Sequence, residues 1–230
     1  MKKYSHIFFD LDRTLWDIEV NSNIVLSDMF NLFGLKDKLN TISDEFINVY
    51  KRYNDTVWKQ YTAGQIGKME LRALRYNLTL NHFNYNDEKL AGELDNYYIT
   101  NTPKQKTLMP YSLEVLDYLK SKDYKMAIVT NGFEDIQQVK VKSGGIEKYF
   151  EKIFSSETTG FAKPAKEIFD YALNYFGINA QNAIMIGDDW EADIMGATNA
   201  GIDQVYYTPI NEDRKCTFKI TCLKDLYNIL

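Results

Sequence analysis

The chain has 230 residues, of which 45% are hydrophobic and 26% are charged, and its formal net charge is −5. These values exclude wholesale disorder and predict no strong general attraction to polymeric nucleic acid. Two cysteines, Cys216 and Cys222, are too few for a disulfide framework and match no zinc motif. No apolar run approaches the ~20 residues that cross a bilayer, and residues 1–4 lack the apolar stretch of a signal peptide. We therefore expect a soluble, cytoplasmic protein that has no membrane partner.

Short apolar runs predict buried parallel strands, and segments with helical spacing of apolar residues separate most of them. Alternation of strands and helices is typical of βαβ units around a parallel sheet. In chain order, the expected elements are a strand at 6–9, several helices within 17–104, a helix at 111–121, a strand at 126–129, helices at 134–142 and 165–176, a strand at 183–186, a helix at 192–200 and a strand at 204–207.

The connection between the first two predicted strands is too long for an ordinary crossover. About a dozen residues suffice for such a connection, yet roughly 115 residues lie between these strands. Between Trp16 and Asn101 the chain has no proline, and its apolar residues recur at helical spacing. We therefore predict an inserted helical domain at 17–104 and a discontinuous sheet domain formed by 1–16 and 105–230.

Polar residues stand at the ends of three predicted strands: Asp10, Thr130 and Asp188. Ligands of open parallel sheets bind outside the carboxyl ends of the strands, so we expect these side chains to converge. Carboxylates brought together raise one another's pKa unless a cation intervenes, and a hard cation with oxygen ligands suits the site. The pattern therefore predicts Mg²⁺, although each aspartate taken alone is also a common turn or helix cap.

Lys163 precedes Pro164, and proline is favoured in the first turn of a helix. The lysine is therefore expected at the mouth of a helix, where the dipole favours anions over cations. An anion bound nearby would explain this misfit. The alternative is an ordinary exposed lysine.

Four segments together resemble the motifs of the haloacid-dehalogenase-like phosphohydrolase superfamily. They occur in the family's order and extend along the whole predicted sheet domain. A single DxDxT would be a weak signal, whereas the ordered set is specific. The segments are DLDRTL at 10–15, TNG at 130–132, Lys163-Pro164 and GDDWEADI at 187–194. The resemblance implies a Rossmann-like α/β fold, with a five-stranded parallel sheet flanked by helices, and identifies the insertion as an all-α cap domain.

The same resemblance implies the roles of individual residues. Asp10 would be the nucleophile that forms an aspartyl-phosphate, and Asp12 the general acid and then the general base. Thr130 would donate to the phosphoryl oxygens and Lys163 would stabilise their charge. Asp10, Asp188 and the main-chain carbonyl of Asp12 would hold Mg²⁺, with Asp193 or Asp189 behind them. The expected substrate-binding positions are Leu11, Asp12, Thr130, Asn131 and Lys163.

Within the superfamily, the segment after TNG and residues 160–173 (GFAKPAKEIFDYAL) resemble the pyrimidine 5′-nucleotidase branch. The expected partner is thus a small phosphorylated metabolite, and the chain is expected to be a monomer or homodimer. A sugar-phosphate phosphatase, a phosphomutase and a non-catalytic phosphate-binding protein remain alternatives. Candidates for substrate contact in and next to the cap are Trp16, Asn21, Trp58, Arg72 and Arg75.

One residue departs from the first motif of the family. Arg13 stands where the family often has glycine. Because Asp10 and Asp12 are intact and the position flanks them, we expect the Arg13 side chain to point away from the phosphate.

Overall fold

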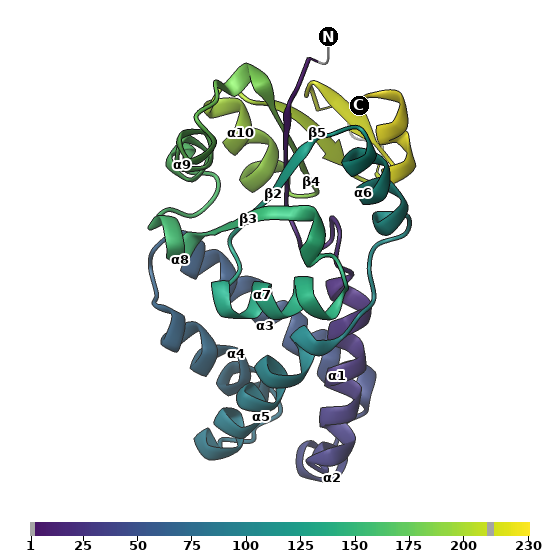
Figure 1. Ribbon diagram of the computed structural model, residues 1–230. Coiled ribbons are helices and arrows are strands. Elements are labelled where there is room, and N and C mark those ends of the chain that lie inside the picture. Colours follow the sequence, from purple (N-terminus) through teal and green to yellow (C-terminus); the bar gives the residue numbers. More distant parts are fainter. Residues whose placement is uncertain (1–2, 211–213) are drawn as a thin grey trace. The chain divides into compact units, whose positions relative to one another are not determined.

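The predicted strands form one parallel sheet in the computed structural model, which describes residues 3–210 and 214–230 (Figure 1). Among these residues the sheet has six strands in the order β3-β2-β1-β4-β5-β6, and every neighbouring pair is parallel. The predicted α/β class is therefore confirmed, whereas the expected count of five strands is wrong. The strands are β1 (His6–Phe9), β2 (Lys125–Thr130), β3 (Phe150–Ser155), β4 (Ala183–Gly187), β5 (Asp203–Tyr207) and β6 (Phe218–Ile220).

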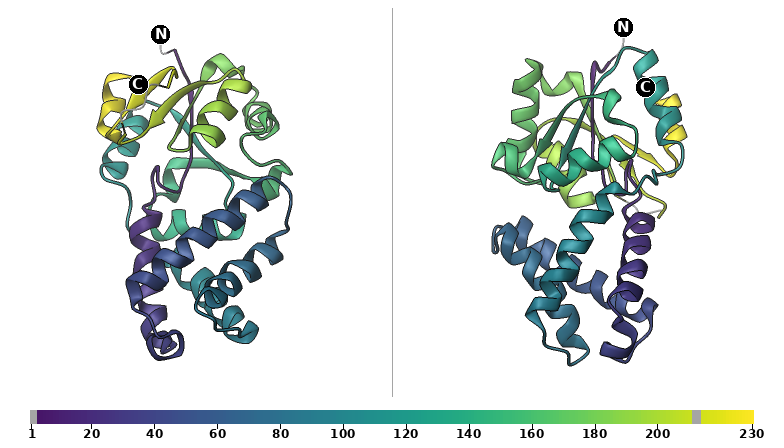
Figure 2. Two further views of the ribbon diagram at one scale, coloured as in Figure 1. Left: turned by 180° about the vertical axis from the view of Figure 1, so that it is seen from behind. Right: turned by 60° about the horizontal axis from the view of Figure 1, so that its bottom comes forward.

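Successive residues of the central strands face opposite sides of the sheet, and each side packs against its own helices (Figure 2). Phe8 on one face belongs to the same apolar cluster as Phe169 of α9 (Lys166–Phe176). Phe9 on the other face clusters with Leu116 of α6 (Ser112–Ser121). This double coverage explains why the central strands are continuous apolar runs.

This part of the chain contains further helical segments. The helices predicted at 134–142 and 165–176 are confirmed to within one residue at each end by α7 (Glu134–Ser143) and α9. The helix predicted at 192–200 is instead a wide π-helical turn, η4 (Trp190–Met195), followed by α10 (Gly196–Asn199). The remaining segments are α8 (Ser156–Thr159) and the 3₁₀ turns η2 (Glu147–Tyr149), η3 (Ala180–Asn182) and η5 (Leu223–Asn228).

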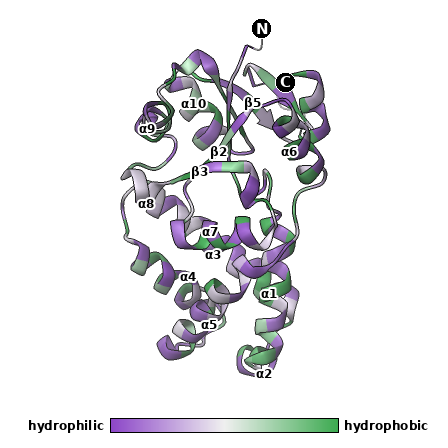
Figure 3. Cartoon of the chain, viewed as in Figure 1, coloured by the Kyte–Doolittle hydropathy of each residue, from purple (hydrophilic) through white to green (hydrophobic). Residues whose placement is uncertain are grey.

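Residues 19–104 form a second compact unit, separate from the unit formed by Met1–Ile18 and Gln105–Leu230. Its described elements are all helical, and polar and apolar residues alternate around them (Figure 3). The apolar sides meet in a core of their own that includes Phe46, Tyr50 and Leu80. The elements are α1 (Ile18–Leu32), α2 (Leu35–Leu39), α3 (Ser43–Thr62), α4 (Lys68–His82), α5 (Glu88–Asn101) and η1 (Thr102–Lys104).

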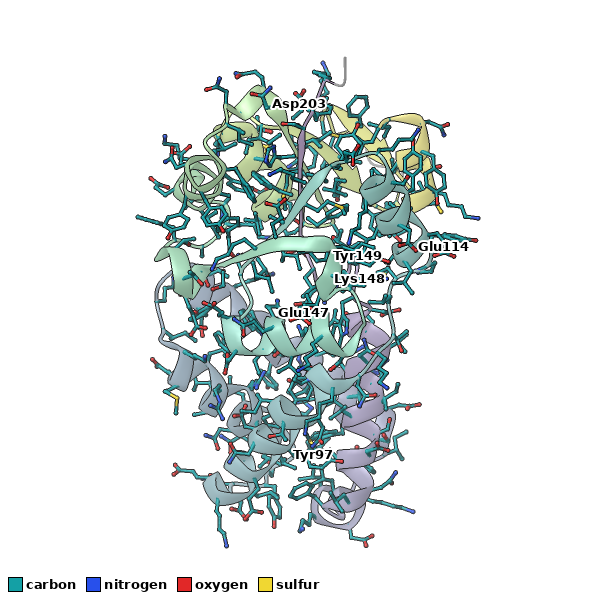
Figure 4. The ribbon with its side chains drawn as sticks, in the orientation of Figure 1. Tyr97, Glu114, Glu147, Lys148, Tyr149 and Asp203 are labelled. Carbon is teal, nitrogen blue, oxygen red and sulfur yellow. The ribbon has the colours of Figure 1, made fainter. Side chains whose placement is uncertain are left out.

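A cluster of polar contacts lies at the amino ends of β1 and β5, at the opposite end of the strands from the expected site. The carboxylate of Asp203, labelled in Figure 4, accepts hydrogen bonds from Lys3 Nζ at 2.7 Å and from Tyr4 Oη at 2.6 Å. Met1 and Lys2, part of the segment examined for a signal peptide, lie outside the described residues. In the described part of the chain, no helix has the length and apolar character needed to cross a membrane.

Candidate active site

Three strand ends that lie side by side in the sheet carry the polar residues picked out in the sequence. Asp10 follows β1, Thr130 ends β2 and Asp188 follows β4, and β1 lies between β2 and β4. The Asp10 N–H still donates to the carbonyl of Ile186 at 2.9 Å, which fixes its backbone to the sheet. Carboxylate oxygens of Asp10, Asp188 and Asp193 lie within 4.8 Å of one another. Two of the three residues picked out at strand ends, Asp10 and Asp188, thus bring their carboxylates together.

A buried lysine links two of these carboxylates. Lys163 Nζ donates to Asp10 Oδ1 at 2.7 Å, to Asp193 Oδ1 at 2.6 Å and to the carbonyl of Val129 at 2.8 Å. Burial alone would lower the pKa of Lys163, but the charges of Asp10 and Asp193 outweigh burial and raise it. Burial also raises the pKa of Asp10 well above its ordinary value, although Lys163 opposes this rise. The ammonium group is thus held in its charged form beside Asp10.

The backbone that carries Lys163 is fixed by a side chain of the second motif. Asn131 Oδ1 accepts from the Lys163 N–H at 2.7 Å, and Asn131 Nδ2 donates to the Lys163 carbonyl at 2.9 Å. The expectation that Pro164 opens the helix is wrong, because α9 begins at Lys166 and Pro164 lies in the turn before it. The Asn131 amide therefore holds this turn in place, a role that the sequence did not reveal.

The π-helical turn after β4 places the Asp193 carboxylate beside Lys163. Asp193 is fully buried, and its Oδ2 accepts from the Asp189 N–H at 3.0 Å while Oδ1 accepts from Lys163. A Cβ on Gly187 would lie 2.2 Å from Asp193 Oδ2, which explains the glycine before the aspartates. Asp189 accepts from the Ala192 N–H at 2.8 Å and so caps the turn. Asp193 tethers the lysine, whereas Asp189 shapes the backbone.

The carboxylates at the end of β4 have the chemistry of a divalent-cation site. Burial and then the charge of Asp193 raise the pKa of Asp188 from 3.8 to about 7, although Arg13 and Lys163 oppose the rise. The Asp188 carboxylate accepts from Thr14 Oγ1 at 3.2 Å. Buried carboxylates with raised pKa values and converging oxygens match the oxygen donor set that Mg²⁺ takes in proteins. The residues present therefore fit the expected metal.

Asp12 is held by two residues of α7 that sequence reasoning missed. Lys140 Nζ contacts Asp12 Oδ1 at 2.6 Å and Oδ2 at 2.7 Å, and Gln137 Nε2 donates to Asp12 Oδ2 at 2.9 Å. The same Nε2 lies 2.9 Å from Thr130 Oγ1. A lysine and a glutamine three residues apart on a helix normally indicate a solvated face, so these residue types did not predict a contact with Asp12. Their spacing, which places them on one side of the helix that follows TNG, was the available signal.

The turn between Asp10 and the first helix brings Arg13 into an uncommon backbone conformation. The carbonyl of Leu11 accepts from the N–H groups of Leu15 at 2.9 Å and Trp16 at 2.8 Å, which closes the turn. Arg13 has a φ of 65°, in the left-handed region that favours glycine. This explains why glycine is common at the position. The charge of the exposed Arg13 side chain opposes the rise in the pKa of Asp188. The expected direction of the side chain relative to a phosphate stays a prediction.

The five candidates for substrate contact have different environments. Arg75 is buried in the helical unit and donates to Asp95 Oδ1 at 2.6 Å through Nη2, and its guanidinium lies 5.1 Å from the Tyr98 ring. We therefore assign Arg75 to the core of that unit, since its charge already has a buried partner. Trp16 is likewise a core residue of the sheet unit. The other three are buried Asn21, half-buried Trp58 and half-buried Arg72, which donates to Asp95 and Asn96.

The sequence also matches known proteins along most of its length. The sequence model of the haloacid dehalogenase-like hydrolase family matches residues 4–201, which include every motif residue of the site. The chain belongs to the haloacid dehalogenase-like hydrolase family. The prediction of this superfamily, and of a hydrolase, is confirmed.

Relatives of this hydrolase in the family include two named nucleotidases. It is 32% identical to pyrimidine 5′-nucleotidase YjjG of Escherichia coli, over 87% of this chain and 84% of the relative. It is 29% identical to pyrimidine 5′-nucleotidase PynA of Streptococcus pneumoniae, over 99% and 95%. The crystal structure of the putative hydrolase YfnB of Bacillus subtilis, bound to magnesium, matches with a TM-score of 0.90 and 27% identity, covering 100% and 99% of the two chains.

Proposed function

We propose that this hydrolase is a Mg²⁺-dependent phosphomonoesterase that acts through an aspartyl-phosphate and prefers pyrimidine nucleoside 5′-monophosphates. The observation that carries the reaction type is the contact of Lys163 Nζ with Asp10 at 2.7 Å, in a cluster of buried carboxylates at adjacent strand ends. The similarity to two pyrimidine 5′-nucleotidases supports the substrate class. The magnesium in the YfnB structure supports the metal.

The first half of the proposed reaction transfers the phosphoryl group to Asp10. An Asp10 carboxylate oxygen attacks phosphorus, the bond between phosphorus and the ester oxygen breaks, and Asp12 gives its proton to the leaving oxygen. Thr130 donates to a phosphoryl oxygen, and the Lys163 ammonium offsets charge on the nucleophile and the phosphate. Mg²⁺, held by Asp10, Asp188 and the Asp12 carbonyl, would supply further charge neutralisation when bound.

The second half regenerates the enzyme. Asp12, now a carboxylate, takes a proton from water as the water oxygen attacks phosphorus. The bond between Asp10 and phosphorus breaks, and inorganic phosphate and the free Asp10 carboxylate result. Two displacements with a good internal nucleophile are each easier than one direct attack by water. Asp193 keeps Lys163 in place through both steps, because its Oδ1 lies 2.6 Å from Nζ.

The proposal is tested by kcat/KM for a panel of phosphate esters with Mg²⁺: dUMP, dTMP, purine nucleotides and sugar phosphates. We expect dUMP and dTMP to be preferred, and the Asp10→Asn variant to lose activity by about 10³-fold or more. Asp170→Asn, a carboxylate on α9 paired with Lys166, is the matched control and should keep wild-type rates. Hydrolysis of sugar phosphates alone would reject the nucleotidase assignment, and an active Asp10→Asn variant would reject the covalent mechanism. Residues 17–104 remain the expected source of specificity.

A further inference from the structure

Asp12 is the only group in the proposed mechanism that must both give and take a proton, so its orientation decides both half-reactions. Its side chain is about one-fifth exposed, while Lys140 is 7% exposed. The carboxylate contacts that fix it come from α7, through Lys140 and Gln137, which are three residues apart on that helix. A single helix face therefore determines how the Asp12 carboxylate is turned.

Lys140 Nζ contacts both oxygens of the Asp12 carboxylate, at 2.6 and 2.7 Å, and these contacts restrict rotation about the last side-chain bond of Asp12. The ammonium group also lies 4.6 Å from the centre of the Trp16 ring. The fully buried Trp16 forms part of the core, so the ammonium group lies over a ring that is itself held in place. The charged end of a long, flexible side chain is thereby held by both the carboxylate and the ring.

Gln137 links Asp12 to Thr130, the residue proposed to bind the phosphate. It is fully buried, and its Nε2 is shared between Asp12 Oδ2 and Thr130 Oγ1. Its Oε1 is buried without a hydrogen-bond partner among the described residues, which costs free energy. The amide therefore keeps an orientation in which Nε2 contacts Asp12 and Thr130, while Oε1 has no partner among the described residues. A Cβ on Gly132 would lie 1.9 Å from Nε2, so the glycine of TNG leaves the space that this amide occupies.

We propose that Lys140 is a positioning residue that, together with Gln137, orients the Asp12 carboxyl group for proton transfer to and from the substrate oxygens. This inference rests on the proposed phosphomonoesterase function, in which Asp12 is the general acid and base. Lys140 acts through Asp12 and needs no contact with the substrate. Its loss should therefore slow only the steps in which Asp12 gives or takes a proton.

Leaving-group dependence separates this role from a merely structural one. An alkyl phosphate needs a proton on its leaving oxygen, whereas p-nitrophenyl phosphate can expel a stable phenolate. Lys140→Met keeps an unbranched side chain and removes the charge. In a single turnover, we expect it to slow phosphoryl transfer to the enzyme by about 10²-fold from an alkyl phosphate and by less than about 5-fold from p-nitrophenyl phosphate, whereas hydrolysis of the phosphoenzyme, which needs Asp12 as a base, should slow equally for both. Lys140→Arg, which keeps the charge and can bind a carboxylate through two N–H groups, should restore part of the loss.

The matched control is Lys142→Met, an exposed lysine on the same helix, which should leave both rates unchanged. Equal losses in the rate of phosphoryl transfer from the two substrates in Lys140→Met, or no loss, would overturn the inference. A second measurement needs no activity. Lys140→Met should lower the thermal unfolding midpoint in the wild-type chain and much less in an Asp12→Ala background, whereas equal shifts in both backgrounds would contradict the pairing. If wild type hydrolyses neither substrate, the proposed function fails and the unfolding comparison still decides the pairing.

Discussion

The raised pKa of Asp188 predicts that the site destabilises the protein when no metal is bound. The native state holds the Asp188 proton more tightly than the unfolded chain does, because the pKa rises from 3.8 to about 7 on folding. The favourable contribution of Asp188 to the free energy of unfolding is therefore fully present below about pH 4 and is lost as pH rises through about 7. At pH 8 the rise corresponds to a cost of about 4 kcal/mol at most, at ~1.36 kcal/mol for each pKa unit.

Asp188→Asn removes this cost. The amide keeps an oxygen for Thr14 Oγ1 but must itself be desolvated, which costs about 1–3 kcal/mol. In EDTA at pH 8 we therefore expect the variant to be more stable than wild type by about 1–3 kcal/mol, and inactive. At pH 5.5 wild-type Asp188 is mostly protonated in the native state, so the advantage should shrink by about 2 kcal/mol.

Urea unfolding at the two pH values, in EDTA and in Mg²⁺, measures these differences. Mg²⁺ should stabilise wild type by binding the native state and should stabilise the variant much less. Glu114→Gln is the control, because Glu114 is an exposed carboxylate on α6 (Figure 4) and its loss should change stability by less than about 0.5 kcal/mol. If Asp188→Asn is no more stable than wild type at pH 8 in EDTA, the electrostatic reasoning is wrong.

Three further substitutions test the local geometry. Gly132→Ala should displace the Gln137 amide, cost about 1–3 kcal/mol in urea unfolding and lower kcat, and equal stability with wild type would contradict the close approach. Asn131→Ala removes two hydrogen bonds to the Lys163 backbone and should lower kcat by about 10²-fold; an unchanged kcat would show that the turn holds Lys163 without them. Arg13→Gly relieves a φ of 65° and should raise the free energy of unfolding by up to about 1 kcal/mol at pH 5.5, where Asp188 is mostly protonated, and a loss of stability would show that the Arg13 side chain contributes more than its backbone costs.

The central strands could be predicted because both faces of the sheet are covered, which makes each strand a continuous apolar run. The edge strands lack this signal. β3 mixes exposed Glu151 and half-buried Lys152 with apolar residues, and β6 has only three residues, so neither stands out from a loop. Helix bounds were predictable for α7 and α9, where apolar spacing is regular. The π-helical turn was not, because its shape depends on the Asp193 side chain packing over Gly187.

In the site, residues at strand ends could be placed from the sequence, because parallel strands bring their carboxyl ends together. Asp10, Thr130 and Asp188 have this property. Lys140 and Gln137 do not, because their position depends on how α7 packs against β3, which the residue types alone do not encode. Arg75 shows the opposite case. An arginine suited to a ligand is paired with Asp95 inside the helical unit instead.

The most direct test of the central claim is to trap the phosphorylated Asp10. An Asp12→Ala variant can still pass its phosphoryl group from p-nitrophenyl phosphate to Asp10, because that leaving group needs little protonation, but it lacks the base that activates water. Rapid acid quench and peptide mass spectrometry should find one phosphoryl group on Asp10, removable by hydroxylamine and absent in the Asp10→Asn/Asp12→Ala variant. Turnover of p-nitrophenyl phosphate with no phosphorylated Asp10, or with the label on another residue, would contradict the account.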